Sequence, residues 1–437
     1  MLMRRYFHGG DPHDVDRAVE AGAAAVATNP AEYYQPRFLS NLGNALWARS
    51  EGTGDLTDLN EAIDTFQRAT EATPVTNPHR ATYLSNLGNA LRARFQRMGN
   101  SADLDRAVVA GSAAVAATAS PGHPEWGLHR SNLSNALLAR FDRGGVVADV
   151  DGATEAYGEA VAQAAPGHPN RPMFLTNLGN SWLSRFERLG DPADLNRAIE
   201  AGARAVAAAG PGHPQRAPSL SNLGNKLLAR YRLAGDPADF DGAVEAMTEA
   251  LGAIGAHHPL RATVLSNLGL AFLDRFERTA DPLDLHRARE AMGRAVEVDV
   301  APAGLRLRAA RRLAEAIGTA EEPAAAVPAY TRAVGLLPLV AWHGVGRRDQ
   351  QQLLEEHGAS LGRDAAGAAI ASGQLELTAM LLEQGRAVLW SELMNGRTDL
   401  ARLRQAHPAL GTALTNCRAV LDRLPDAGPG PIIGHLN

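Results

Sequence analysis

The apolar positions of this chain follow helical spacing, and they occur in pairs of segments. Leu84, Leu87 and Leu91 lie three and four residues apart within residues 80–97, which places them on one face of a helix. Leu104 and Ala107 begin a second apolar face in the segment that follows. The pattern predicts a unit of two helices, each with one buried side.

This two-helix unit recurs along most of the sequence. An Asn-Leu dipeptide marks each first helix, with copies 45 or 46 residues apart, and Asp-(Leu/Val/Phe)-x-x-Ala marks each second helix at a similar period. We therefore predict six repeats over residues 31–300, preceded by a partial repeat, the second helix only, at residues 1–30. The asparagines of the Asn-Leu marker are Asn41, Asn86, Asn132, Asn177, Asn222 and Asn267.

Aspartate, proline and glycine mark the ends of the predicted helices. Asp-Pro precedes several second helices, where the carboxylate can accept from free amides and proline loses no hydrogen bond. Pro-Gly-His-Pro follows several of them, where glycine ends one helix and the last proline opens the next. The Asp-Pro pairs begin at Asp191, Asp236 and Asp281, and the Pro-Gly-His-Pro turns occupy residues 121–124, 166–169 and 211–214.

The repeat resembles the tetratricopeptide (TPR) repeat, whose signature is W-x2-L-G-x2-Y, then A-x3-F, then P. The unit is longer here, mostly between its two helices. Residues 301–341 fit the family spacing without an insertion, so the last repeat has the short form. The matching residues are Leu39, Leu42, Gly43, Leu46, Ala62, Phe66, Ala69 and Pro74 in repeat one, and Leu313, Ala314, Ile317, Ala326, Tyr330, Ala333 and Pro338 in the short repeat.

The resemblance implies an all-α fold, a right-handed TPR-like superhelical solenoid of antiparallel helix pairs. We expect a helical C-terminal extension at residues 342–424 and a tail at residues 425–437. Residues 382–390 and 397–400 resemble the helices just before the caspase-like CHAT domain of bacterial TPR–CHAT proteins.

The N-terminal end is expected to begin inside a repeat. Arg5-Tyr6 stands before the first Asp-x-x-x-Ala marker where other repeats have Arg-Phe, so the chain is expected to be part of a longer one. The predicted helix at residues 14–28 would then leave an apolar edge with Val15, Val19 and Val26. We expect this edge to fray or to self-associate with a second molecule.

One asparagine in each of five repeats is predicted to face a groove. In TPR arrays the first helices line the concave side, and the residue after the Leu-Gly pair faces it. A side-chain amide offers a donor and an acceptor, so a ladder of amides can bind the backbone of an extended peptide. The alternative is that these amides bond to each other and fix repeat stacking. This outer set is Asn44, Asn89, Asn135, Asn180 and Asn225.

Two further ladders have a mainly structural interpretation. The asparagines of the Asn-Leu marker, the inner set, are predicted to fix the stacking of repeats. An arginine near the end of each first helix could hold phosphate or an acidic peptide, but an ion pair with an aspartate nine residues later is favoured. The arginines are Arg94, Arg140, Arg185, Arg230 and Arg275, and the aspartates are Asp103, Asp149, Asp194, Asp239 and Asp284.

No arrangement of residues predicts catalysis. The recurring histidines stand a full repeat apart, too far to share a metal ion, and are predicted to be turn residues. The single cysteine, Cys417, lies with His407 in a predicted helical tail without an oxyanion-forming loop. We therefore predict no enzyme activity, catalytic residue, metal or cofactor. The histidines are His123, His168, His213 and His258.

Composition narrows the class of partner and the location. Of 437 residues, 45% are hydrophobic and 21% charged, which is ordinary for a folded protein. The net charge of −5 does not favour a nucleic-acid partner. No apolar run reaches the roughly 18 residues of a membrane span, and the N-terminus lacks a signal sequence. We expect a cytoplasmic protein with no membrane partner.

Two functions fit these observations. The first is a protein- or peptide-binding scaffold or sensor, the regulatory arm of a larger signalling or defence protein whose caspase-like effector is absent from this chain. The second is the ligand-sensing repeat arm of a nucleotide-driven switch or transcription regulator. Both would use the same groove.

Overall fold

The described part of the chain is built from α-helices. The computed structural model describes residues 12–28, 34–53, 55–118, 123, 125–320, 323–340 and 360–385, and no strand occurs among them. The helices are α2 (Pro12–Ala27), α3 (Gln35–Thr53), α4 (Leu56–Glu71), α5 (Arg80–Met98), α6 (Ser101–Ala117), α7 (Trp126–Gly144), α8 (Val147–Gln163), α9 (Arg171–Leu189), α10 (Pro192–Ala208), α11 (Arg216–Ala234), α12 (Pro237–Gly252), α13 (Leu260–Thr279), α14 (Pro282–Glu297), α15 (Ala303–Ala320) and α16 (Pro323–Val340).

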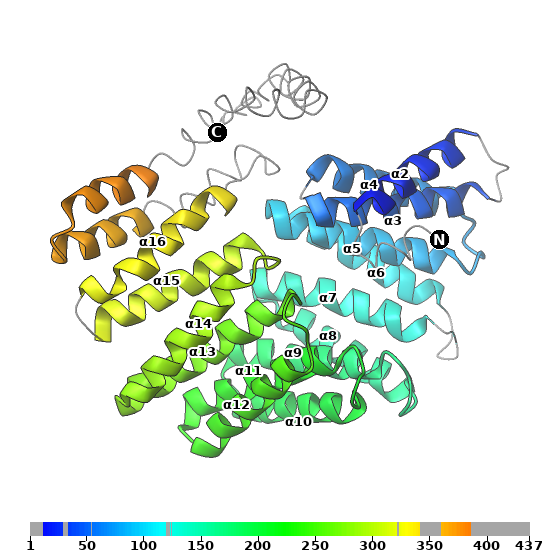
Figure 1. Ribbon diagram of the computed structural model, residues 1–437. Coiled ribbons are helices and arrows are strands. Elements are labelled where there is room, and N and C mark those ends of the chain that lie inside the picture. Colours follow the sequence, from blue (N-terminus) through cyan, green and yellow to red (C-terminus); the bar gives the residue numbers. More distant parts are fainter. Residues whose placement is uncertain are drawn as a thin grey trace, which may run out of the picture.

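Successive helices pack in pairs, from α3 with α4 to α15 with α16. Each second helix also packs on the first helix of the next pair, and α2 packs on α3 in the same way. The pairs therefore follow one another as a solenoid (Figure 1). The predicted all-α solenoid of helix pairs is confirmed for the described residues.

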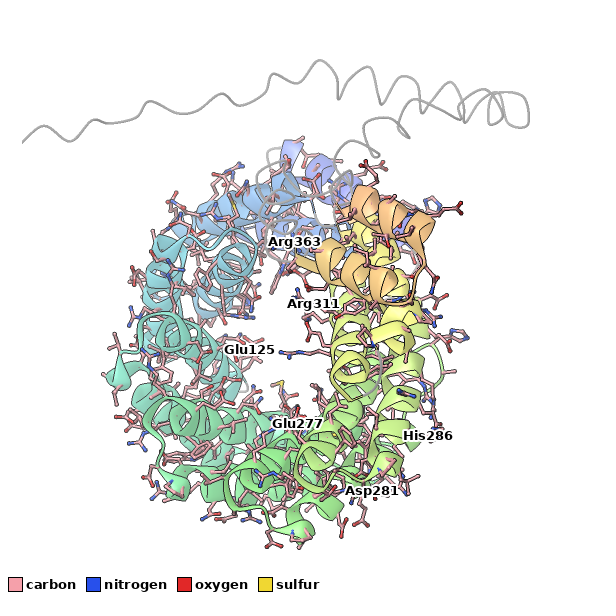
Figure 2. All side chains as sticks on the ribbon, turned by 90° about the vertical axis from the view of Figure 1, so that its left-hand side faces the viewer. Glu125, Glu277, Asp281, His286, Arg311 and Arg363 are labelled. Carbon is pink, nitrogen blue, oxygen red and sulfur yellow. The ribbon has the colours of Figure 1, made fainter. Side chains whose placement is uncertain are left out.

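The pairs curve around a central space, with first helices inside and second helices outside (Figure 2). Glu125, Glu277 and Arg311, which lie in or next to first helices, are on the inner side, whereas His286 of α14 is on the outer side. First helices of neighbouring pairs also contact each other directly, for example α5 with α7 and α9 with α11. We call the line of these contacts the inner seam.

In several pairs a glycine of the first helix lies against the backbone of an alanine in the second. A Cβ atom built on Gly179 of α9 would lie 2.9 Å from the carbonyl oxygen of Ala198 in α10, and one on Gly88 would lie 3.2 Å from that of Ala107. The first helix therefore approaches the backbone of the second too closely for a larger residue at Gly179. The alanines of the Asp-x-x-x-Ala marker that have no exposed surface are Ala62, Ala107, Ala153, Ala198, Ala243 and Ala288.

The helix ends follow the sequence signals. Asp191, Asp236 and Asp281 each accept a hydrogen bond from the amide two residues on, at 2.9, 3.0 and 3.0 Å, as helix-capping residues do. The first helices of repeats two to five end at a glycine with φ between 68° and 76°. In repeat six Ala280 occupies that position with φ 54°.

The N-terminal end of the array differs from expectation, whereas the described residues of the C-terminal extension are helical, as predicted. Val15 and Val19 of α2 are only 4% and 8% exposed, so they do not form the apolar edge predicted for this helix. At the other end, helices span residues 360–371 and 375–385, and Leu361 and Leu381 join the core of α15 and α16. Residues 386–437, with most of the predicted CHAT-like junction, Cys417 and the tail, lie outside the described residues.

Candidate functional site

The outer asparagines lie on the first helices, and all five are half-buried. Two contacts join them to the neighbouring repeat. Asn86 Nδ2 donates to Asn44 Oδ1 over a long 3.5 Å, and Lys226 Nζ donates to Asn180 Oδ1 at 2.6 Å. These contacts join α3 to α5 and α9 to α11, so Asn44 and Asn180 lie at the inner seam.

The remaining outer asparagines differ in their partners. The hydroxyl of Tyr157, in α8, donates to Asn135 Oδ1 at 2.7 Å. Asn89 and Asn225 have no side-chain hydrogen-bond partner among the described residues. The predicted ladder is therefore divided into three amides whose oxygen is used internally and two amides with no internal partner.

Lys226 is a charged residue buried in the array. Its side chain is completely buried, and Nζ donates to Asn180 Oδ1 and, at 3.3 Å, to the carbonyl oxygen of Asn222. Its chain crosses Gly179, where an added Cβ would lie 2.9 Å from Lys226 Cε. Burial lowers the pKa of Lys226 to about 8, and no carboxylate pairs with it in the described part of the chain. It is the only lysine of the sequence.

Arg92 brings a second poorly compensated cation to the first helices. Burial lowers the pKa of its guanidinium, and Tyr157 and Glu51 oppose that shift only in part. Its Nε is buried and makes no hydrogen bond. Both Arg92 and Lys226 interrupt the repeat pattern, since other repeats have different residues in their places. That departure is the signal that could have identified them from the sequence.

The inner asparagines bridge repeats in part of the array. Asn132 Nδ2 donates to Ser85 Oγ of the preceding repeat at 2.8 Å, and Asn177 Nδ2 makes a longer contact of 3.4 Å with Ser131 Oγ. Asn222 instead donates to the carbonyl of Pro218 in its own helix at 2.8 Å. Asn41 is exposed, and Asn267 has no side-chain partner among the described residues. With the 3.5 Å contact of Asn86 to Asn44, the inner set therefore links repeats one to four, but not every repeat.

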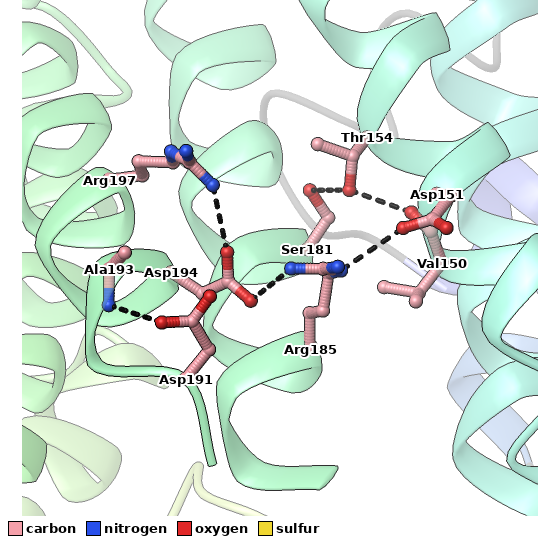
Figure 3. A network of polar contacts seen from close by, with 9 residues as sticks. All are labelled: Val150, Asp151, Thr154, Ser181, Arg185, Asp191, Ala193, Asp194 and Arg197. Carbon is pink, nitrogen blue, oxygen red and sulfur yellow. Dashed lines mark hydrogen bonds and ion pairs between the residues drawn. The ribbon is translucent and has the colours of Figure 1, made fainter. Parts of the chain in front are cut away.

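Each predicted arginine pairs with the aspartate nine residues later. The carboxylates are buried, and Asp194 is held by Arg185 and also, at 3.1 Å, by Arg197 (Figure 3). The other pairs are Arg94–Asp103 at 2.5 Å, Arg140–Asp149 at 2.7 Å, Arg230–Asp239 at 2.6 Å and Arg275–Asp284 at 2.6 Å.

The same arginines also contact the preceding repeat, which the sequence analysis missed. Arg185 Nε donates to Asp151 at 3.0 Å, and Arg94 Nη1 donates to Asn60 at 2.9 Å. The sequence feature that could have predicted this contact is an Asp or Asn two residues after the aspartate of the Asp-x-x-x-Ala marker. The remaining contacts are Arg140–Asp105 at 3.2 Å, Arg230–Asn196 at 3.0 Å and Arg275–Asp241 at 4.0 Å, and Arg49 of repeat one makes the equivalent contact with Asp16 at 3.6 Å.

The recurring histidines act in the turns, as predicted. His168 Nδ1 accepts from the amide of Asn170 at 3.1 Å, and the next residue, Arg171, donates to the carbonyl of Val161 at 2.7 Å. The histidine thus caps the start of one helix, while the arginine caps the end of the previous one. The same amide-to-Nδ1 contact occurs at His123, His213 and His258, at 3.2, 3.0 and 3.1 Å.

Metal clusters, membrane spans and pockets are the other features of the described residues that bear on function. No group of three or more His, Cys, Asp or Glu side chains there could hold a metal ion. None of the helices described is long and apolar enough to cross a membrane. A small pocket of about 250 Å³ lies between α14, α15 and α16, away from the outer asparagines.

The geometry defines a TPR-like solenoid with a polar inner seam. No protein-family model and no curated protein matches the sequence. Among solved structures, the chain is similar to one described as a kinesin light chain of Podosopora anserina with nearly identical TPR-like repeats, at 20% identity and a TM-score of 0.37, over 49% of this chain and 96% of that one. A single-substitution variant of that protein matches over 49% and 95%, at the same identity and score. The human IFIT1 dimer with PPP-AAAA matches at 10% identity and a TM-score of 0.45, over 87% and 69%.

Proposed function

We propose that this protein is a binding scaffold whose inner seam holds an extended segment of another protein. One observation carries the proposal: the outer asparagines recur at the seam, and two of them, Asn89 and Asn225, have no internal partner among the described residues. The recurring arginines, aspartates and histidines, by contrast, are engaged in holding the repeats together. The outer asparagines are thus recurring polar residues that keep hydrogen-bonding groups without an internal partner among the described residues.

The test is a double substitution in a pull-down. Changing Asn89 and Asn225, which have no internal partner among the described residues, to alanine should abolish capture of a partner while leaving helicity and melting nearly unchanged. A matched double change of outer-side residues, Asn60 and Asn196 to alanine, should preserve capture. If the asparagine variant melts much earlier, the outer set is structural and the proposed site is wrong.

The wider context of the protein is a separate proposal. The likeness of residues 382–390 and 397–400 to a pre-CHAT junction supports a regulatory arm that controls a caspase-like effector in a cytoplasmic signalling or defence system. A caspase-like domain encoded in frame or next to this chain would support it. A nucleotide-driven switch domain in that place would support the alternative role as its ligand-sensing arm.

Self-association through the N-terminal end stays a separate prediction. It was expected from an apolar edge on α2, and Val15 and Val19 of that helix are buried.

A further inference from the structure

The orientation of Asn180 follows from the chemistry of its partner. A protonated lysine carries only donors, so the amide atom 2.6 Å from Lys226 Nζ is the oxygen. Because Lys226 is completely buried, it keeps that oxygen turned into the array. The Nδ2 group of Asn180 is therefore the half of the amide left for a ligand.

Asn135 has the same arrangement with a different partner. The Tyr157 hydroxyl donates to its oxygen at 2.7 Å, and the Tyr157 side chain is completely buried. The Nδ2 atoms of Asn135 and Asn180 have no partner among the described residues, yet neither is a buried unpaired atom. Both donors therefore reach solvent.

Asn89 and Asn225 complete the pattern on either side. Neither amide has an internal partner in the described part of the chain, so each can donate and accept at once. Such an amide can make two hydrogen bonds to the backbone of one extended residue of a ligand, donating to its carbonyl oxygen and accepting from its N–H group. Along these four repeats, Asn89 and Asn225 can thus each donate and accept, whereas Asn135 and Asn180 between them present only a donor to the ligand.

The spacing of these contacts sets a minimum ligand length. Asn89 and Asn225 are three repeats apart, and packed helices lie about 8–10 Å from one another, so the two are separated by roughly 24–30 Å. An extended chain covers about 3.3–3.6 Å per residue. A segment that reaches both therefore needs roughly eight residues.

We propose that the inner seam binds an extended peptide segment of at least about eight residues. Asn89 and Asn225 bind the two ends of this segment. Between them, Asn135 and Asn180 donate hydrogen bonds to its carbonyl groups. This inference rests on the proposed function. It adds the length of the ligand and its polarity, meaning that the ligand offers acceptors rather than donors to the middle of the seam. A ligand that offers only donors to the middle of the seam fits less well, because the outward Nδ2 groups of Asn135 and Asn180 would then have no acceptor.

The test uses peptides selected on the protein itself. A display library of random 12-residue peptides is panned against the full chain, and a selected peptide is synthesised with a fluorophore for anisotropy titrations. The informative variant is Asn180→Asp, since it keeps an acceptor for Lys226 but removes the outward donor. We expect its binding to weaken at least tenfold, with an unfolding temperature equal to or above that of the wild type.

A matched control has the same change of charge on the outer side. Asn196→Asp keeps the acceptor for Arg230 and should bind the peptide as tightly as the wild type. Removing residues from the peptide should reduce affinity at least tenfold once fewer than about eight remain.

The outcomes separate this inference from the proposed function. If a selected peptide binds wild type and Asn180→Asp equally well, or if a six-residue fragment binds as tightly as the whole, the polarity or length is wrong while the binding function stands. A lower unfolding temperature for Asn180→Asp would overturn the orientation of this amide. Failure to select any peptide would overturn the proposed function itself.

Discussion

Arg94 donates two hydrogen bonds to the carboxylate of Asp103, from Nε at 2.8 Å and from Nη2 at 2.5 Å. The aspartate side chain is 3% exposed and the arginine 19%, so the pair is largely removed from water. A buried pair of this kind need not stabilise more than an apolar pair of the same size. Removal of one partner is costly, however, because it leaves the other charge buried and uncompensated.

We therefore expect Arg94→Met to be strongly destabilising. The free energy of unfolding should fall by about 3 kcal/mol, at the lower end of the range for a broken buried pair. The double variant Arg94→Met with Asp103→Leu should recover much of this loss. Urea unfolding followed by circular dichroism measures both.

The matched control is an exposed pair in the same array. Arg68 and Asp64 lie 3.7 Å apart and are 52% and 67% exposed, so Arg68→Met should cost less than about 0.5 kcal/mol. A cost for Arg94→Met no larger than this would show that the buried pair does not hold the repeat.

Ala280 is the next testable position, because it has a left-handed backbone with φ 54°. Glycine adopts this conformation without steric cost, and four preceding repeats have glycine there. Ala280→Gly should raise the free energy of unfolding by about 1 kcal/mol. Thermal melting of the purified chain measures the change.

The reciprocal change supplies the control. Gly190 has φ 76°, and an added Cβ would meet no atom within 4 Å, so Gly190→Ala tests backbone conformation without a clash. It should destabilise by about 1 kcal/mol. If both substitutions shift the melting temperature in the same direction, backbone strain is not their cause.

The fold was predictable because one set of positions is buried in every repeat. The 45-residue period and the Leu-Gly and Asp-x-x-x-Ala markers predict helix pairs, and Ala198 is completely buried like its counterpart in every other 45-residue repeat. The pairing of Arg94 with Asp103 was predictable for the same reason, because both residues belong to one repeat.

Contacts between repeats were harder to predict. Asn60 is 34 residues before Arg94, and Asn180 is 46 residues before Lys226, so neither pair follows a local spacing. Their meeting depends on the stagger of one repeat against the next. That stagger is set by the packing of whole helices, and only the structure reveals it.

His129 should make stability depend on pH in the acid range. Its side chain is 1% exposed, and Nδ1 lies 2.7 Å from the Thr118 hydroxyl. Burial lowers the pKa of His129 below its usual 6.5, more than nearby Glu125 raises it. The folded state therefore binds this proton less readily than the unfolded state, and stability falls as the pH drops below 6.5.

The comparison needs a variant that cannot titrate there. His129→Gln keeps a polar side chain, and its melting temperature should decline less than that of the wild type between pH 7.5 and pH 5. Parallel pH curves for the two proteins would mean that His129 does not contribute to the acid sensitivity.

Lys226, like His129, should make the stability of the fold rise with pH, but in the alkaline range. Burial lowers its pKa from 10.5 to about 8, so the charged form is disfavoured in the folded state. Below pH 8 the ammonium is charged in both states, and its burial costs roughly 3 kcal/mol. As the pH rises from 8 to 10.5 that cost disappears. Lys226→Met should therefore be more stable than the wild type at pH 7, by up to this amount, and lose the advantage by pH 10.

Peptide binding provides an independent measurement on the same variant. Without Lys226, the oxygen of Asn180 is free to accept from a ligand, so peptides with a donor at that position should be selected on Lys226→Met but not on the wild type. Lys226→Arg is the contrasting variant, because it keeps a donor but adds bulk over Gly179.

A stability difference between wild type and Lys226→Met that stays constant from pH 7 to pH 10 would show that the buried ammonium is not the cause.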